Sequence, residues 1–569
     1  MAIAGSKAQM KVLLVVSPNF SIKMLEEEID NLAQGSSDFT RSVDWRPAAP
    51  LGILYIAGAL RRAGHDVEIY DLHRAFYMCR EEGYLSQNGL SDFFRDYFDS
   101  ILESNEIDVL GISCLFNVSS STVEEMGLRC RLVSPSTKIV LGGHYPTSMY
   151  REVLKAGFCD YIVLGEAEEE FVWLLDHLGD QLVDEKISNN PNVVDLKGVD
   201  YPDRRAAIIG DLNGLAVPAW DLLPDAMDYI TNSIDAERVG SSMEEKTVRA
   251  ASIFTTRGCP MRCTFCAAHG VHGRRVRAHS IEYVMNNIDW LVNNYEINNL
   301  LIQDDMFNFT AERTIEFCEA LVSKYGDRFD LEFPNGLAVW KLNEELIINL
   351  KRAGLKSITI AVESGSPYVQ KHLLKKNLNL SLVKERVELL KKHDIGVRAF
   401  YIVGFVGETM EMMQETVQFA LDLDIDWSEL KAFVPLAGSE MYDIAKEKGY
   451  LVGDTSEHVY GRGSIETPEF TPKQVEDVRY DANIRINFLN NSYLKRRKYA
   501  NAEQTFRRLL KNFPNHLFAQ HGLWRALDGQ GKTDDSEEAL NRLIGLSNES
   551  ENNRLLLDKY QIKLPTLHN

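Results

Sequence analysis

The sequence lacks any long apolar segment. No apolar run approaches the roughly 20 residues that a membrane-spanning helix needs. The first run, from Lys11 to Ser17, stops at Pro18 and is too short for a secretory signal. We therefore expect no membrane span and a cytoplasmic protein.

Positive charge and cysteine are also scarce. The chain has 62 Lys and Arg against 83 Asp and Glu, a formal net charge of −21, which argues against binding to nucleic acid or anionic lipid. Eight cysteines in 569 residues are too few for a disulfide scaffold. With 45% apolar and 25% charged residues, the chain has the composition of a folded globular protein, long enough for about three or four domains.

Apolar runs alternate with helical patterns in the N-terminal third. Because strands that alternate with helices form parallel sheets, we expect an α/β domain over residues 1–180. Ligands bind such sheets at the carboxyl ends of the strands, where this chain has the turns 142–147 and 165–168. The predicted strands are 11–17, 66–72, 108–113, 138–143 and 161–166.

The rest of the chain divides into three further parts. Residues 181–249 lack the alternation of apolar runs and helical patterns, which indicates a linker. Residues 446–569 have helical patterns. Two of these predicted helices, separated at Pro514, resemble a tetratricopeptide helix pair. Between them, residues 250–445 hold six strand–helix units, which indicate an open or partial (β/α)6 barrel. Its predicted strands are 253–256, 300–303, 331–334, 358–362, 399–403 and 429–434.

Three cysteines are clustered at the carboxyl end of the first barrel strand, where barrel enzymes hold their catalytic groups. They are Cys259, Cys263 and Cys266. A cluster of four irons normally takes four cysteines, so three would leave one iron open to a substrate. Alternatively, His269 would complete a closed Cys3His zinc site. On the cysteines alone, both sites remain open.

The spacing Cys259-x3-Cys263-x2-Cys266, with Phe265 before the last cysteine, resembles the signature of radical S-adenosylmethionine (SAM) enzymes. Turns after the later strands resemble the SAM-binding turns of that family, which disfavours zinc. The matching positions are Glu363 and Ser364 in an ESGS turn, Gly404 and Gly407 in a G-x-x-GET turn, and the turn 435–439. After the second strand, the family often has a Gly-Gly-Glu turn that contacts SAM. This chain has Asp304 and Asp305 there, so it departs from the family's pattern at this contact.

The N-terminal domain resembles the Rossmann-like cobalamin-binding domain that precedes the barrel in one subclass of radical SAM enzymes. The resemblance rests on residues 50–52, 142–144 and 165–168. Cobalamin domains that ligate cobalt by histidine have a D-x-H-x-x-G loop after their first strand, and this chain has Pro18, Asn19 and Phe20 there. The resemblance therefore implies cobalamin bound in the histidine-off state, with the cofactor near Ser17, Ser113, Gly142, Gly143, His144, Gly165 and Glu166.

A second histidine, a basic turn and a basic run each allow two interpretations. Asp71 and His73 look like part of the histidine motif, but they follow the second strand and Phe76 replaces its glycine, so a solvated loop is the simpler interpretation. Arg274, Arg275 and Arg277 either meet a substrate carboxylate or phosphate or form a solvated turn. The basic run 495–498 is either a solvated helix face or a docking patch.

Together these resemblances imply a 4Fe-4S cluster, SAM, cobalamin and a 5′-deoxyadenosyl radical, most simply for methylation of an unactivated carbon. Alternatives are ring closure or oxidation on the same architecture, a methylthiotransferase with a second cluster on Cys79, Cys114 and Cys159, and a non-catalytic cobalamin-binding adaptor. The resemblance implies an electron donor such as flavodoxin or ferredoxin. The substrate class, whether small molecule, lipid or peptide, is not encoded. We expect residues 446–485 to form a lid, and residues 490–545 to dock a partner or simply pack.

Overall fold

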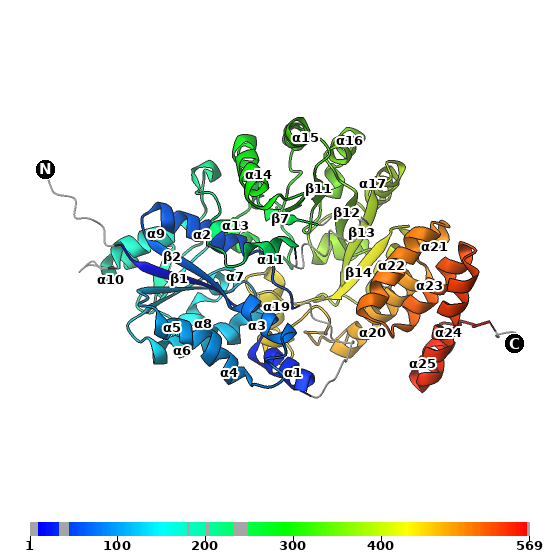
Figure 1. The fold of residues 1–569 in the computed structure, drawn as a ribbon, viewed down its shortest axis with the longest axis horizontal. Coiled ribbons are helices and arrows are strands. Elements are labelled where there is room, and N and C mark those ends of the chain that lie inside the picture. The colour runs from blue at the N-terminus through cyan, green and yellow to red at the C-terminus, as the bar shows by residue number, and fades with distance from the viewer. Residues whose placement is uncertain (1–8, 34–44, 179–182, 201–203, 232–247, 566–569) are drawn as a thin grey trace.

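The computed structural model describes residues 9–33, 45–178, 183–200, 204–231 and 248–565 (Figure 1). An α/β domain comes first, a barrel-like array of strands and helices follows it, and helices form the C-terminal part (Figure 1). In the described part of the chain, no helix combines the length and apolar character needed to cross a membrane.

The N-terminal sheet contains the five predicted strands, all parallel, in the order β2-β1-β3-β4-β5. The order reverses between β1 and β3, which makes the carboxyl ends of these two strands the switch point where such sheets bind ligands. An unpredicted antiparallel strand, β6, lies at the edge beyond β5. The bounds are β1 (Lys11–Val16), β2 (Asp66–Asp71), β3 (Val109–Ser113), β4 (Lys138–Gly142), β5 (Tyr161–Val163) and β6 (Val193–Asp195).

Helices cover both faces of this sheet, because its strands are apolar on both sides. Val12 and Leu14 of β1 face a core shared with α2 (Leu51–Arg62) and α9 (Ala167–His177), whereas Leu13 and Val15 face the opposite core. Helices of the second layer are α1 (Ile22–Ala33), α3 (Leu72–Glu81), α4 (Leu90–Phe94), α5 (Ser100–Ser104), α6 (Ser120–Val133), α7 (His144–Ser148) and α8 (Tyr150–Lys155).

The segment predicted as a linker is ordered where it is described, and it joins the two domains. It contains α10 (Val183–Asn189), β6 and α11 (Ala226–Thr231). Trp220 is fully buried in the core that contains residues of β1, α2 and the barrel. The Tyr229 hydroxyl donates to Asp71 at the end of β2. The first two domains therefore share one hydrophobic core.

The barrel contains six parallel strands, as predicted, arranged as β11-β10-β7 and β12-β13-β14. Bridges from Leu331 to Leu355 and from Leu337 to Ile360 connect the two halves. The first strand lies three residues earlier than predicted, because residues 256–257 leave it to form β8 (Thr256–Arg257), which pairs with β9 (Arg277–Ala278). The bounds are β7 (Ala250–Ile253), β10 (Asn299–Ile302), β11 (Asp330–Glu332), β12 (Ser357–Glu363), β13 (Gly396–Val403) and β14 (Trp427–Ala432).

Helices follow the strands and pack their apolar faces against them (Figure 1). Along β13 the outward residues are fully buried beneath helices, whereas Arg398, Phe400 and Ile402 on the other face are only half-buried. The interior of the barrel is therefore partly polar and accessible. The helices are α13 (His269–His272), α14 (Ile281–Tyr295), α15 (Ala311–Tyr325), α16 (Glu344–Arg352), α17 (Leu380–Lys392), α18 (Met410–Asp422) and α19 (Glu440–Glu447).

The free edge of β14 is covered by the segment that follows the barrel. Asn487 accepts from the Ser428 amide at 2.9 Å and donates to the Ser428 carbonyl at 2.7 Å, and Asn483 donates to the Leu430 carbonyl at 3.1 Å. These side chains lie one helical turn apart, on α20 (Pro472–Asn483) and on the π-helical turn η9 (Ile484–Leu489). They satisfy backbone groups that an edge strand would otherwise expose.

The C-terminal helices form a separate layer beside β14 (Figure 1). Successive helices are neighbours, and their core contains Phe506, Phe518 and Leu543. Pro514 lies between α22 and α23, as predicted. The helices are α21 (Ser492–Lys495), α22 (Tyr499–Asn512), α23 (Leu517–Gly529), α24 (Thr533–Glu549) and α25 (Glu551–Lys559).

Candidate functional site

The three clustered cysteines lie on one anchored loop between β8 and α13. Gly258 begins the loop with φ +92°, and a Cβ there would lie 2.4 Å from the Arg275 carbonyl oxygen, so the turn requires glycine. Thr264 fixes the middle of the loop: its amide donates to the Leu374 carbonyl at 3.1 Å and its hydroxyl donates to the Leu373 carbonyl at 2.6 Å. The thiols are thereby held against the barrel.

Burial and nearby charges set the electrostatics of the loop. Cys259, Cys263 and Cys266 are half-buried, and burial raises the pKa of each thiol, that of Cys263 to about 12. The charge of Lys376 opposes this effect at Cys259 and Cys263. Because a bound metal deprotonates its thiol ligands outright, the raised pKa values describe the metal-free loop.

The donor set fits a 4Fe-4S cluster better than a single zinc ion. Among the described residues, no three His, Cys, Asp or Glu side chains are grouped so that they could hold one metal ion. The side chains of Cys259, Cys263, Cys266 and His269 are thus not arranged as a closed zinc site in this structure. Each thiolate of a 4Fe-4S cluster binds a different iron, so the three thiolates need not converge on one point.

Asp304 and Asp305 follow β10 but have different environments. Asp304 is buried, and it accepts from the Thr255 amide at 2.6 Å and from the Thr256 hydroxyl at 2.9 Å. Burial raises the pKa of Asp304 to about 6. The charge of Asp305, in contrast, acts on Cys259 and Cys266. The structure thus places Asp305 near the cysteines, whereas Asp304 ties β10 to the start of the cysteine loop.

The turn after β12 is buried and internally bonded. The Ser364 hydroxyl shares a hydrogen bond with that of Thr416 at 2.9 Å, and Gly365 has no room for a side chain because a Cβ would lie 2.3 Å from that of Phe419. Glu363 adopts φ +67°, and its carboxylate accepts from Lys376 at 3.1 Å. This pair brings the end of β12 to the cysteine loop, since Lys376 also acts on two of the thiols.

The turn after β13 is organised around Glu408. Its Oε2 accepts from the amides of Gly404 at 2.7 Å and Phe405 at 3.0 Å, and both Gly404 and Gly407 have positive φ. Burial raises the pKa of Glu408 to about 8. Phe405 lies 5.8 Å from Phe265 between ring centroids, which places this turn against the cysteine loop.

The predicted residues of the N-terminal domain gather at the switch point of its sheet. The Ser17 hydroxyl donates to the Ser113 carbonyl at 2.7 Å, joining the ends of β1 and β3. At Gly142, a Cβ would meet no atom within 4 Å, so open space lies beside it. Gly143 has φ +106° and no room for a Cβ, which would lie 2.5 Å from the Cys114 carbonyl oxygen. Open space at a strand-end glycine fits the presence of a bound cofactor.

This edge of the sheet faces the cysteine loop directly. The His144 Nε2 bonds to the carbonyl of Ala267, the residue after Cys266, at 2.6 Å. Burial lowers the pKa of His144. Because a carbonyl oxygen can only accept, Nε2 is the donor in this hydrogen bond. Asn117, in the loop after β3, donates to the Pro435 carbonyl at 3.1 Å. The strand-end loops of the two domains are therefore in contact.

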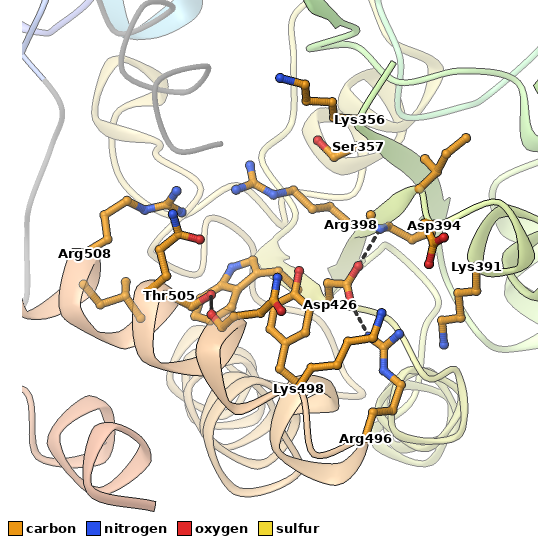
Figure 2. Close-up of a pocket in the computed structure, with 18 of the residues that line it drawn as sticks. Lys356, Ser357, Lys391, Asp394, Arg398, Asp426, Arg496, Lys498, Thr505 and Arg508 are labelled. Carbon is orange, nitrogen blue, oxygen red and sulfur yellow. Dashed lines mark hydrogen bonds and ion pairs between the residues drawn. The ribbon is translucent and has the colours of Figure 1, made fainter. Parts of the chain in front are cut away.

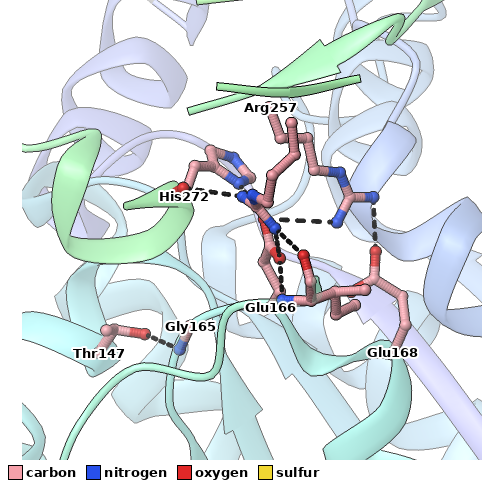
Figure 3. Close-up of polar contacts among 8 residues, drawn as sticks. Thr147, Gly165, Glu166, Glu168, Arg257 and His272 are labelled. Carbon is pink, nitrogen blue, oxygen red and sulfur yellow. Dashed lines mark hydrogen bonds and ion pairs between the residues drawn. The ribbon is translucent and has the colours of Figure 1, made fainter. Parts of the chain in front are cut away.

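Glu166 and Glu168 form a buried ionic network with the barrel (Figure 3). Arg277 donates to both Glu166 oxygens, at 2.6 and 2.7 Å, and His272 bonds to Glu166 at 2.9 Å. Arg257 donates to Glu168 at 2.6 Å. Burial alone would raise the pKa of Glu166, but the bonds from Arg277 and His272 hold it at about 2. The Glu166 carboxylate thus joins the two domains across the start and end of the cysteine loop.

Gly165 and His73 also have structural partners. Gly165 has φ +83°, its amide donates to the Thr147 hydroxyl at 3.0 Å, and a Cβ would collide with Ala207 (Figure 3). His73 is buried and not solvated: its Nδ1 accepts from the Asn19 amide at 3.4 Å, and its Nε2 bonds to the Trp45 carbonyl at 2.9 Å. The solvated-loop interpretation of His73 is therefore wrong, since both ring nitrogens are occupied within the fold.

Several important residues were missed or misjudged from the sequence. Of the basic turn, Arg274 and Arg275 are exposed, but Arg277 is buried and meets a carboxylate of this chain. Arg257 and Lys376 were not singled out. The position of Arg257, two residues before Cys259, was a usable signal, because a charged residue in a buried strand needs a partner. Nothing in the sequence distinguishes Lys376 from the lysines around it.

Two parts of the chain match known domain families. Residues 253–420 match the Radical SAM superfamily, and residues 46–175 match the B12 binding domain. The cytidylyl-2-hydroxyethylphosphonate methyltransferase of Streptomyces wedmorensis is 25% identical over 452 residues, which cover 74% of this chain and 82% of that protein. The anaerobic magnesium-protoporphyrin IX monomethyl ester cyclase of Cereibacter sphaeroides is 26% identical over 447 residues, which cover 78% of this chain and 66% of that protein.

The fold is also shared with a solved structure. The cobalamin-dependent S-adenosylmethionine radical enzyme OxsB, with aqua-cobalamin bound, superposes with a TM-score of 0.59 at 15% identity. The superposition covers 97% of this chain and 81% of that chain. At this level of identity, the likeness shows the fold alone.

Proposed function

This chain is a radical SAM enzyme with an N-terminal B12-binding domain, as its motifs predicted, and from this premise we propose that it methylates an unactivated carbon with the help of cobalamin. One observation carries the proposal: the cysteine loop faces the ligand-binding edge of the B12-binding sheet, with His144 bonded to Ala267 at 2.6 Å. Two reactive groups held on these two surfaces would share one site.

The residues that would hold each group are assigned as follows. Cys259, Cys263 and Cys266 would hold the cluster, and the strand-end loops of the first domain would hold cobalamin. When bound, the cluster and SAM supply a 5′-deoxyadenosyl radical and cobalamin supplies a methyl group. Phe265 and the turns at Asp305, Glu363 and Ser364, and Gly404 to Gly407 would enclose SAM. Asp304 would position the cysteine loop, because its oxygens are occupied by Thr255 and Thr256.

We propose that residues 446–485 exclude water from this site. The Tyr460 carbonyl accepts from the Ala432 amide at 3.1 Å, and Lys431 lies over the rings of Phe400 and Tyr460 at 5.2 and 5.3 Å. Glu457 pairs with Lys23 of the first domain at 2.6 Å. The segment thus connects the barrel edge to the B12-binding domain, and a reactive radical needs such a closed site.

We propose that cobalamin binds without a histidine from this chain on cobalt. Both nitrogens of His73 are bonded within the fold, and the Nε2 of His144 is bonded to Ala267. Leu115 and Phe116, in the loop after β3, are 46% and 44% exposed. Two exposed apolar side chains at a ligand-binding strand end fit the flat, largely apolar surface of a corrin ring.

A second candidate function is ring closure on the same architecture, which the cyclase of Cereibacter sphaeroides brings into consideration because it matches 78% of this chain. Products separate the two. Methylation would release S-adenosylhomocysteine in addition to 5′-deoxyadenosine, whereas cyclisation without methyl transfer would release 5′-deoxyadenosine alone.

We also propose that the enzyme receives electrons from a donor such as flavodoxin or ferredoxin, and that it is located in the cytoplasm. All eight cysteines are free thiols, and a cluster held by thiolates is suited to a reducing compartment. The proposed substrate is a small molecule, a lipid or a peptide.

The test is an anaerobic reconstitution with iron, sulfide and cobalamin, followed by incubation with SAM and reductant. We expect near four irons and one cobalamin per chain, and formation of 5′-deoxyadenosine. The triple variant C259A/C263A/C266A should lose iron and SAM cleavage but keep cobalamin, whereas C318A, which changes a core cysteine of α15, should keep all three. Iron retention and SAM cleavage in the triple variant would refute the cluster assignment.

A further inference from the structure

A cavity of about 480 Å³ lies between the first residues of strands β12 to β14 and helix α22 (Figure 2). This volume is in the range of small-molecule sites, which span roughly 300–1,000 Å³. The barrel contributes Lys356, Arg398 and Trp427, and the C-terminal helices contribute Arg496 and Arg508 (Figure 2). No function discussed above uses this cavity.

Positive charge dominates its lining, although the chain as a whole carries a formal charge of −21. Among the described residues that line the cavity, three carry a carboxylate: Asp394, Asp426 and Glu429. Six of them carry a cationic side chain: Lys356, Lys391, Arg398, Arg496, Lys498 and Arg508. An acidic protein repels anions over most of its surface, so a basic concavity is where an anion would be captured.

Ion pairs fix the walls of the cavity. Arg496 pairs with Asp426, whose other oxygen accepts from the Val397 amide at 2.8 Å (Figure 2). Lys391 pairs with Asp424 at 2.7 Å. These contacts hold α21 and the start of β13 in place, so the cavity is pre-formed.

Two arginines enter the cavity from opposite walls. Figure 2 shows the side chain of Arg398, from β13, extending across the cavity toward that of Arg508, from α22. Glu332 is a carboxylate on which the charge of Arg398 acts. Burial raises the pKa of Glu332 to about 7, so this carboxyl is only partly ionised at neutral pH. Two guanidinium groups that face one cavity from opposite walls are suited to bind a single anion between them.

The floor of the cavity adds polar and aromatic surface. Tyr493 and Trp427 are half-buried there. The charges of Arg496, Arg398 and Arg508 all act on the Tyr493 hydroxyl and lower its pKa, although burial keeps that pKa raised at about 12. The charges of all three guanidinium groups therefore reach the Tyr493 side chain.

We propose that this cavity is a second ligand site, which takes a phosphorylated small molecule. Guanidinium groups bind phosphate through paired, charge-assisted hydrogen bonds, and Arg398 and Arg508 are positioned to do so from two sides. The ligand would bridge β13 and α22 and so hold the C-terminal helices against the barrel.

The site is separate from the cysteine loop. Arg398 lies near the start of β13, and Gly404, in the turn assigned to SAM, follows its end. Six residues of extended strand span about 20 Å. A molecule in the cavity would therefore act as an effector or a structural ligand, and its binding does not depend on the proposed reaction.

The test is isothermal titration of the reconstituted protein with inorganic phosphate, pyrophosphate and AMP. We expect saturable binding of one molecule per chain. R398Q and R508Q should each weaken it roughly tenfold or more, because each removes a charge-assisted contact. R508K should weaken it less, since it keeps the charge. The matched control is R497Q: Arg497 is exposed, lies between Arg496 and Lys498 and does not line the cavity, so this variant should bind as the wild type does.

The outcomes separate this site from the proposed function. The variant C259A/C263A/C266A should bind the three probes unchanged. Absence of saturable binding at millimolar concentrations would overturn the proposal, as would equal affinity in R398Q, R508Q and the wild type. If R398Q unfolds, R508Q and R508K decide the outcome, because Arg508 belongs to helix α22 and not to strand β13.

Discussion

Glu166 and Glu408 are both buried carboxylates, yet their pKa values move in opposite directions. Glu166 has Arg277, His272 and Arg257 around it, so its pKa is held at about 2. Glu408 has only two backbone amides as donors, and its Oε1 has no hydrogen-bond partner among the described residues. Burial then dominates and raises its pKa to about 8. The difference shows that cationic partners, not depth, decide the charge of a buried glutamate here.

Glu408 makes stability depend on pH. Its ordinary pKa is 4.5 and its pKa in the fold is about 8, so the folded chain holds a proton that the unfolded chain releases between these values. The stabilisation is fully present below pH 4.5 and is lost as pH rises toward 8, by about 1 kcal/mol per pH unit. E408Q cannot ionise, so its thermal midpoint should fall less between pH 6 and 8. Equal slopes for E408Q and the wild type would contradict this assignment.

Arg277 should contribute far more to the stability of the fold than its neighbour Arg275 does. R277M leaves the buried Glu166 without its two-bond partner and should cost about 3 kcal/mol, measured as a lower thermal midpoint. R275M changes an exposed side chain of the same turn and should change stability by about 0.5 kcal/mol or less.

The double variant E166Q/R277M provides the control for this pair. It should be more stable than the sum of the single variants predicts, because the buried charge is removed together with its partner. Since the pKa of Glu166 is lowered, the wild-type advantage should be present above pH 4.5 and should fall as pH drops toward 2. A fully additive double variant would show that the contact does not stabilise the interface.

The elements of the barrel were predictable in order but not at their ends. All six strands follow the expected sequence, because alternation of apolar runs with amphipathic helices is a local property. The first strand was misplaced by three residues, since pairing of Arg257 with Arg277 across the cysteine loop draws residues 256–257 away from it. The edge strand β6 was missed because its three residues carry little periodic signal.

The asparagine pair at the edge of β14 tests the predicted lid. N483A/N487A removes the side chains that bond to Ser428 and Leu430, so it should loosen the predicted lid, residues 446–485, from the edge of β14. We expect more 5′-deoxyadenosine per methylated product than in the wild type, because water reaches the radical. N490A, which changes an exposed residue directly after η9, should keep the wild-type ratio. An unchanged ratio in N483A/N487A would show that the contacts at the edge of β14 do not help to exclude water from the site.

At the scale of the molecule, the hydrophobic cores divide the chain differently from its sequence motifs. The B12-binding domain and the barrel share one core, which includes Leu14, Trp220 and Ile302. The C-terminal helices have their own core around Phe506 and Leu543. We therefore expect the first two domains to unfold together and the helices to unfold separately.

This division has a calorimetric test. L543A removes a fully buried side chain of α24 and should destabilise the C-terminal transition by about 2–5 kcal/mol while leaving the main transition in place. I302A, in the shared core, should lower the main transition instead. A single transition that moves as a unit in both variants would show that the helices fold together with the rest.

The sequence by itself determined the fold class, the order of the domains and the cysteine loop. These depend on local periodicity and on short motifs, such as Cys259 to Cys266 and Gly404 to Gly407, whose residues are neighbours in the chain. Only the tertiary structure decided the partners of Glu166, His144 and Asp304. Their side chains bond to residues more than 40 positions away, and the energy of a buried charge depends on which side chains surround it. The basic cavity between β13 and α22 was likewise decided by the tertiary structure, because only folding brings Arg398 and Arg508 to the same cavity.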